Sequence, residues 1–473
     1  MHIQIQSRRV VNNMMAVNNT IMKKLWLALL PIFMICLTIP NPAQANDASG
    51  LALQINAIPG LSAAASGSEV IVTGAVAGIT QTLELNINSG VTVKWGAAYY
   101  SSTAMVAPLI TLTGDGVFEV VQTTVGRFPE LTNRGSGATI YATGTNASVI
   151  VSTGGVAAFG GNAILVTGQN ATVTVRGTGR VFNESTTNVR PVIRMDNQSN
   201  NGLNVVVTDY GSVTVALGSG RGYAIETYGN VEVSGNADVQ TRGDSYGRAI
   251  NAIGPNSVVT VSGNSTVRAE NGIAIDAGRS VTVSGGIVYN SGISDSYPAI
   301  LIESGRGGTV FYVTISGTGQ VEARGSGGTA IKSPGDVEVR GNARVSATTD
   351  GYAIHTTGAG NVTVSGGWVT ATNSNAIRAT NGTVTVNGGF VFAYGNAITG
   401  TGNVIHPASS FPSGATGTGV VVAWNANANR REYTEATPTL PSLRLLPRLG
   451  VEAPQDMELT TQTGLTADFS HCQ

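Results

Sequence analysis

Charged residues are scarce in this chain. They make up 11% of its 473 residues, and the formal net charge is −1, whereas an ordinary globular domain has roughly 25% charged residues. A balance so close to neutrality gives no electrostatic reason to expect nucleic acid or an anionic membrane surface as a partner. Any charged binding site must therefore be local.

Cysteine and aromatic residues are also few. Cys36 and Cys472 are the two cysteines of the chain, and aromatic residues make up 6% of it. Because Cys36 lies in the predicted leader, the mature chain would retain a single cysteine and could form no internal disulfide. Glycine, by contrast, is abundant, with 62 residues, which favours short strands joined by tight turns and predicts almost no helix after the leader.

The N-terminus predicts an export signal. Basic Met22–Lys24 precedes an apolar run, Leu25–Ile39, which is too short to span a bilayer comfortably, and Ala43–Ala45 has the small-x-small pattern of a cleavage site. We therefore expect residues 1–45 to be a leader and signal peptide that is cleaved after Ala45. The mature protein would be secreted or at the cell surface, with no transmembrane span.

The chain repeats itself with a period of roughly 21 to 33 residues, which lies in the range typical of solenoids. Each repeat has an Ala-Ile motif or a close variant, then a Val-x-Val pair such as Val362/Val364, and then a single valine such as Val369. The isoleucines of the first motif are Ile164, Ile225, Ile250, Ile275, Ile300, Ile331, Ile354, Ile377 and Ile398. Alternation along Val-x-Val places both valines on one face and the middle residue on the other. The repeat thus predicts a coil of three short strands with its valines inside, stacked in parallel on the coils above and below.

These residues resemble a known group. Val362–Gly367, with the sequence VTVSGG, and corners such as Gly395–Ile398 are similar to those of right-handed parallel β-helix proteins of the pectin-lyase-like superfold, in particular exported bacterial surface proteins with VTVSGG-type repeats. The resemblance covers roughly residues 137–400 and implies an all-β, right-handed parallel β-helix of about ten or more coils. The superfold hosts lyases, hydrolases and adhesins, so it implies little about function.

The repeat pattern also predicts the organisation of the chain. We expect an N-terminal cap and the first coils in residues 46–135, and β-helix repeats with a terminal strand in residues 136–426. Residues 427–473 lose the repeat and contain Pro438, Pro441, Pro447 and Pro454, so we expect an irregular, partly disordered tail.

Stacked coils align equivalent residues in columns, and one such column predicts a binding site. The residues that follow the isoleucines are Glu226, Asn251, Asp276, Leu301, Lys332, His355, Arg378 and Thr399. Three basic residues, Lys332, His355 and Arg378, would occupy consecutive coils, although like charges opposite one another in a sheet are destabilising. They therefore suggest an anionic ligand such as an acidic polysaccharide, while the alternative is a solvated face of mobile side chains.

A second column predicts an aromatic surface. Trp368 and Phe390 precede the single valine in adjacent coils and, if they face outward, could stack on sugar rings. The alternative is that the C-terminal segment around Trp424 covers them.

Catalytic residues are not evident. The outward position of Val-x-Val holds Glu232 and Glu338, which are several coils apart and too distant to act as a carboxylate pair. We expect no catalytic residues, no cofactor and no metal site. The tripeptide Arg242–Asp244 matches an integrin-binding motif, but so short a match is weak, and we interpret it as a glycine corner.

The sequence therefore predicts a structural, adhesive or carbohydrate-binding protein. Its partner would be an extracellular or envelope polysaccharide or a host surface. A polysaccharide lyase or glycoside hydrolase of the same superfold is the alternative.

Overall fold

The computed structural model describes residues 47–393 and several short segments beyond them. Within the first range, the segments that fall outside the described residues are 123–129, 185–189, 197–203, 216–221, 243–246, 293–295, 304–309, 349–350 and 373–374. The segments described further along are 398–400, 404–405, 419–423, 433–434, 458–460 and 466–468. The predicted leader and cleavage site thus lie outside the described residues.

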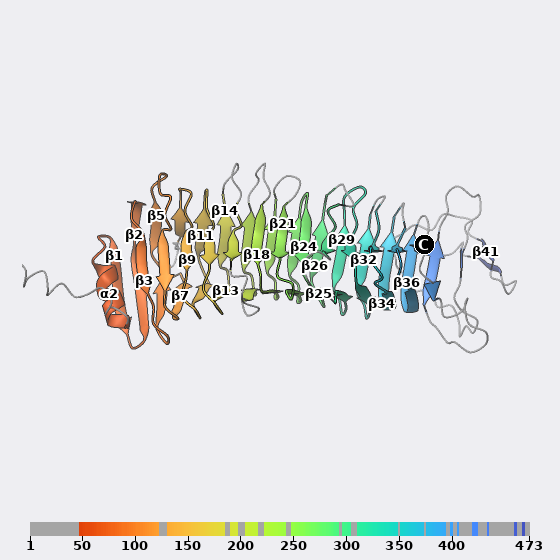
Figure 1. Ribbon diagram of the computed structural model, residues 1–473, viewed down its shortest axis with the longest axis horizontal. Coiled ribbons are helices and arrows are strands. Elements are labelled where there is room, and N and C mark those ends of the chain that lie inside the picture. Colours follow the sequence, from red (N-terminus) through yellow and green to blue (C-terminus); the bar gives the residue numbers. More distant parts are fainter. Residues whose placement is uncertain are drawn as a thin grey trace, which may run out of the picture.

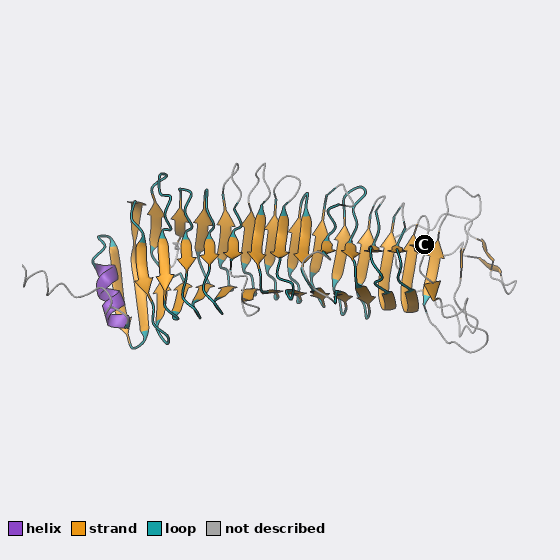
Figure 2. Cartoon of the chain, in the orientation of Figure 1, coloured by secondary structure: helices purple, strands orange, loops and turns teal. Residues whose placement is uncertain are grey.

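The chain winds into a parallel β-helix of about 11 turns, whose coils follow one another along the long axis of the molecule (Figures 1 and 2). Each coil contributes one strand to each of three parallel ladders, which we call ladders I, II and III in chain order. Ladder I is a separate 13-stranded sheet. Ladders II and III belong to one 27-stranded sheet, because the long strands β2 (Glu69–Ile79), β34 (Val362–Ala371) and β36 (Val384–Ala393) run through both.

The strands have the following bounds. Ladder I contains β3 (Leu83–Asn86), β6 (Ile110–Thr113), β9 (Ile140–Ala142), β12 (Ile164–Val166), β15 (Ile193–Met195), β18 (Tyr223–Thr227), β21 (Arg248–Ala252), β24 (Ile273–Ala277), β27 (Ile300–Ile302), β30 (Ile331–Ser333), β33 (Ile354–Thr356), β35 (Ile377–Ala379) and β37 (Ile398–Gly400). Ladder II contains, besides the long strands, β4 (Thr92–Trp95), β7 (Val117–Val120), β10 (Ser148–Val151), β13 (Thr172–Val175), β16 (Asn204–Val207), β19 (Asn230–Val233), β22 (Val258–Val261), β25 (Ser280–Val283), β28 (Tyr312–Ile315), β31 (Asp336–Val339) and β38 (Val404–Ile405). Ladder III contains, again besides the long strands, β5 (Ala98–Ser101), β8 (Glu130–Asn133), β11 (Gly155–Ala158), β14 (Arg180–Asn183), β17 (Ser212–Val215), β20 (Asp238–Thr241), β23 (Thr266–Ala269), β26 (Ile287–Asn290), β29 (Gln320–Ala323), β32 (Arg344–Ala347) and β39 (Val420–Ala423).

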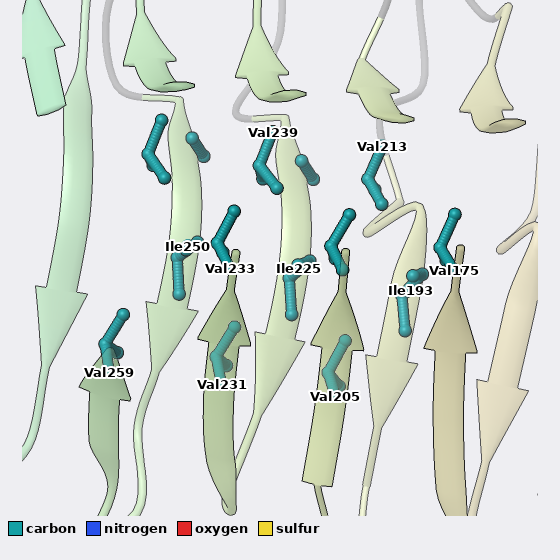
Figure 3. Packing of buried hydrophobic residues seen from close by; sticks show 14 of the residues in the cluster. Val175, Ile193, Val205, Val213, Ile225, Val231, Val233, Val239, Ile250 and Val259 are labelled. Carbon is teal, nitrogen blue, oxygen red and sulfur yellow. The ribbon is translucent and has the colours of Figure 1, made fainter. Parts of the chain in front are cut away.

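The core consists of columns of aliphatic side chains that line the inside of the helix. In ladder II, Val205 pairs with Val231 and Val231 with Val259, and in ladder I, Ile225 pairs with Ile250. All of these side chains are buried (Figure 3). Branched residues suit these positions because they pack well on a pleated, half-buried surface. The predicted all-β parallel β-helix with inward valines is confirmed.

Glycine shapes the corner between ladders II and III. The second glycine of the Ser-Gly-Gly motif, Gly367, has a φ of 71°, and Gly389 in the next coil has a φ of 75°. This left-handed conformation is costly for residues with a Cβ atom. The motif therefore turns the chain without ending the strand, and β34 and β36 each continue through it.

The first coil is capped. Helix α2 (Ala48–Asn56) starts at Asp47, whose carboxylate accepts a hydrogen bond from the Gly50 amide at 2.7 Å, and it buries Leu51 and Ile55. Strand β1 (Leu61–Ser66) pairs antiparallel with β2. Together they cover an end that would otherwise expose a pairing edge. This helix, the only one in the part of the chain that the structure describes, is too short to span a membrane.

Aromatic residues fill the core behind this cap. Trp95 is fully buried, and its ring centroid lies 5.5 Å from that of Tyr99 and 5.8 Å from that of Phe118. The Trp95 Nε1–H donates to the Ala97 carbonyl at 2.9 Å. A large ring thus satisfies its one polar group while it fills the core next to the cap.

The C-terminal part pairs onto the last coils. Strand β39 pairs in parallel with β36 and is the terminal strand expected near the end of residues 136–426. Strand β40 (Tyr433–Thr434) pairs antiparallel with β39. Strands β41 (Glu458–Thr460) and β42 (Thr466–Asp468) form a separate hairpin. The rest of the predicted tail lies outside the described residues.

Glu119, on the outer face of ladder II, leads to a pH-dependent prediction. Burial alone would raise its pKa, but hydrogen bonds from Ser152 and Arg176 and the charges of Arg176 and Lys94 outweigh burial and hold the pKa of Glu119 below its usual value of 4.5. The folded state thus favours the ionised form, and this contribution to stability is present above pH 4.5 and is lost as the pH falls through the lowered pKa. We expect Glu119→Gln to reduce the free energy of unfolding at neutral pH by about 1 kcal/mol and to weaken the loss of stability in acid.

Thermal unfolding between neutral pH and acid would test this. The matched control is Glu232→Gln, because Glu232 occupies the same ladder II column but is exposed. If the two variants have the same pH profile of the melting temperature, the prediction for Glu119 is wrong.

Candidate functional site

The three basic residues predicted to align do so. Lys332 on β30 pairs with His355 on β33, and His355 pairs with Arg378 on β35. Neighbouring strands of a sheet are about 4.8 Å apart, so their side chains form a continuous row on the outside of ladder I. We call Lys332, His355 and Arg378 the basic column.

Tyr352 organises this column. Its ring centroid lies 5.0 Å from that of His355, and its hydroxyl accepts a hydrogen bond from Arg378 Nη1 at 3.0 Å. The Arg378 guanidinium also lies 5.4 Å from the centre of the Tyr352 ring. Arg378 is exposed, whereas His355 is 8% exposed. The tyrosine thus holds the arginine in place while leaving it accessible.

Sequence reasoning missed Tyr352. It precedes the Ala-Ile motif, at a position where the other coils have residues as different as Arg248, Ile273 and Thr329. The available signal was an aromatic residue three positions before His355, in the same coil.

Earlier coils of ladder I carry charges of both signs in the same column. Arg194 pairs with Glu226 at 3.5 Å. Asp276 lies with its Oδ2 2.7 Å from Nε of Arg248, which is outside the column, two residues before the isoleucine of its own coil. Asn251, between the two carboxylates, donates to Glu226 at 3.1 Å. The charges of these residues therefore compensate one another within the chain. The next residue of the column after Asp276 is the apolar Leu301.

Two acidic residues of this network, Glu226 and Asp276, are closer together than Glu232 and Glu338, the pair that the sequence places several coils apart. They lie two strands apart, with Asn251 between them. Asp276 faces outward but is fully buried and paired with Arg248, so its carboxylate is held in an ion pair. Across the described ranges, no group of three or more histidine, cysteine, aspartate or glutamate residues has the arrangement of a metal site.

The predicted aromatic column is also present, on ladder III. Trp368 pairs with Phe390 on the next strand, and the rings of Phe390 and Phe392 lie 6.0 Å apart with planes only 9° from parallel. All three side chains are half-buried. We call Trp368, Phe390 and Phe392 the aromatic patch.

The indole ring of Trp368 is not bare. The guanidinium of Arg344, on β32, lies 4.4 Å above its centre, so one face of the ring is stacked on a cation. The strand beyond Phe390 is β39. Trp424, which we considered as a cover for these rings, lies outside the described residues.

The basic column and the aromatic patch do not form one site, because they belong to ladders I and III respectively. The remaining candidate motif, Arg242–Asp244, starts at a residue held on the surface of ladder III, where Arg242 Nε donates to Gln240 Oε1 at 3.1 Å. Gly243 and Asp244 lie outside the described residues. The structure therefore gives no support to the hypothesis that Arg242–Asp244 binds an integrin.

Comparisons with family models, curated proteins and solved structures found no match to this chain.

Proposed function

We propose that this protein is secreted or displayed at the cell surface, after removal of residues 1–45, and that it binds an acidic polysaccharide through the basic column. It would act as a structural, adhesive or carbohydrate-binding protein. The predicted signal peptide supports this location. The similarity of its repeats to exported right-handed β-helix proteins of the pectin-lyase-like superfold supports the class of protein.

One observation carries the proposal. In the earlier coils the carboxylates of the outward column of ladder I, Glu226 and Asp276, each pair with an arginine, whereas the stretch from Leu301 to Arg378 in that column contains no acidic residue. The cationic side chains of Lys332 and Arg378 lie on either side of His355. An anionic ligand that bridges these strands would contact both, and the Arg378 guanidinium is suited to a carboxylate.

Arg378→Ala tests the proposal. We expect it to weaken binding of the mature chain to polygalacturonate about tenfold, because it removes charge-assisted hydrogen bonds. The remaining affinity should fall less steeply with salt. Calorimetry with the soluble polymer over a series of salt concentrations would measure both effects.

Arg340→Ala is the matched control. It also removes one arginine from these coils, but Arg340 follows ladder II and lies 3.9 Å from Glu338. If both variants lose the same affinity, the polymer responds to net charge and the basic column is not the site. Unchanged binding by Arg378→Ala would also reject the proposal.

A polysaccharide lyase or glycoside hydrolase is the second candidate. The carboxylates that come nearest to a catalytic pair are Glu226 and Asp276, whose strands are two spacings apart, about 9.6 Å, against about 6.5–9.5 Å between the carboxyl groups of inverting glycosidases. The ion pair of the buried Asp276 with Arg248 would have to open for this. A lyase would instead use Lys332 or Arg378 as its base. Steady release of reducing or unsaturated ends from uronate polymers, with calcium present, would favour this candidate over simple binding.

A further inference from the structure

Arg344 differs from other arginines on ladders II and III. Arg324 pairs with Glu322 at 2.7 Å, Arg340 with Glu338 at 3.9 Å, and Arg268 with Asp238 at 3.5 Å. The Arg344 guanidinium, within the residues described, has no ion pair or hydrogen bond, and its contact is the ring of Trp368. The residue is exposed.

The stacking on Trp368 prepares this guanidinium for an anion. A guanidinium that lies flat on a ring keeps its N–H groups around its edge, where they can still donate hydrogen bonds. Its planar fork matches a carboxylate with two parallel hydrogen bonds. Because the stack already restricts the side chain, less conformational entropy is lost when a ligand binds.

The surroundings of Arg344 suit a sugar that carries a carboxylate group. The neighbours of Arg344 in its own column are Gln320 on one side and Trp368 on the other, followed by Phe390. None of them is acidic. The half-buried rings of Phe390 and Phe392 add apolar surface on the next coil, on which the C–H face of a sugar ring can pack.

We propose that Arg344 and the aromatic patch form a second saccharide site, on ladder III, that binds a uronate residue with its carboxylate on Arg344 and its ring on Phe390 and Phe392. This inference rests on the proposed function for the class of ligand, but it assigns a different face of the protein. The basic column spans β30 to β35 on ladder I, and the second site spans β32 to β36 on ladder III. One molecule could therefore hold two polysaccharide strands and cross-link them.

The stoichiometry of binding tests the proposal. With a short oligogalacturonate as the probe, calorimetry on the mature chain should resolve two sites for the unmodified protein, of which Arg344→Ala weakens only the ladder III site and Arg378→Ala only the ladder I site. Arg344→Lys should weaken the second site about tenfold although it keeps the charge, because lysine has no planar fork. Arg340→Ala, the control from the same coil, should retain both sites.

A second measurement covers cross-linking. Light scattering of dilute polygalacturonate should rise on addition of the unmodified protein, and either single variant should abolish the rise while it still binds. If the unmodified protein has one site that only Arg378→Ala removes, the second site is rejected and the proposed function stands. If no form of the protein binds the probe, both are rejected.

Discussion

Replacing Trp95 with alanine should destabilise the N-terminal coils by about 3–5 kcal/mol. The side chain is fully buried between Tyr99 and Phe118, so its removal leaves a cavity that neighbouring strands can fill only in part. It also leaves the Ala97 carbonyl without the Nε1–H donor, and an unsatisfied buried acceptor adds to the cost. Urea unfolding followed by far-ultraviolet circular dichroism would measure the loss.

The location of the damage is part of the same prediction. Each coil contacts only its neighbours, so stability is close to a sum of local terms. The variant should therefore unfold first around β4 to β7 and retain ligand binding at the basic column at low denaturant. Tyr210→Ala, which removes an aromatic side chain that is 67% exposed, is the control and should change stability little. A loss of binding in step with the first unfolding would show that the coils are coupled more strongly than this.

Replacing Gly144 with alanine should be the second severe change. A Cβ atom on Gly144 would lie 1.7 Å from the carbonyl oxygen of Gly114 in the adjacent coil, and a backbone atom held between stacked coils cannot move aside as a flexible side chain can. We expect a loss at or above the upper end of the about 1–3 kcal/mol usual for overpacking. The melting temperature and the urea midpoint of the purified variant would test it.

Gly292→Ala is the matched control. There the nearest atom to an added Cβ would be the Asn271 carbonyl carbon at 3.5 Å, an ordinary contact distance. The substitution should be neutral or stabilise slightly, because alanine restricts the unfolded chain more than glycine. Equal destabilisation by the two substitutions would mean that the close approach of the coils at Gly144 is not the cause.

The register of the fold could be predicted from the sequence. Alternation along Val-x-Val assigns each residue to the inside or the outside, and the repeat then aligns equivalent residues. For that reason the rows that contain Lys332, His355 and Arg378, and Trp368 and Phe390, are confirmed as neighbours. What these rows bind stays a prediction.

Side-chain orientation could not be predicted in the same way. Alternation tells which face Asp276 occupies, but not that Arg248 would pair with it and that it would be fully buried. It places Arg344 beside Trp368 but does not choose the rotamer that stacks the two. These arrangements depend on contacts between coils, and the repeat pattern carries no information about them.

The cap was only partly predictable. Composition argues against helix, and α2 has just nine residues, so its signal is small beside that of the strands. Asp47 is a good N-cap residue, but such residues are common in turns as well. The distinction between glycines that adopt a positive φ, as Gly367 does, and glycines that leave room for a neighbouring carbonyl, as Gly144 does, also requires coordinates.

The stacking of coils has a mechanical consequence. Backbone hydrogen bonds between parallel strands run from one coil to the next. A force that pulls the two ends of the β-helix apart therefore acts along these bonds, and every interface between coils carries the same force. The weakest terminal coil should peel away first. Each released turn of roughly two dozen residues could extend by about 80 Å at about 3.3–3.6 Å per residue. A β-helix that is pulled at both ends would therefore lengthen in steps, one coil at a time. Each step would relieve the tension on the remaining coils and on any ligand that they bind.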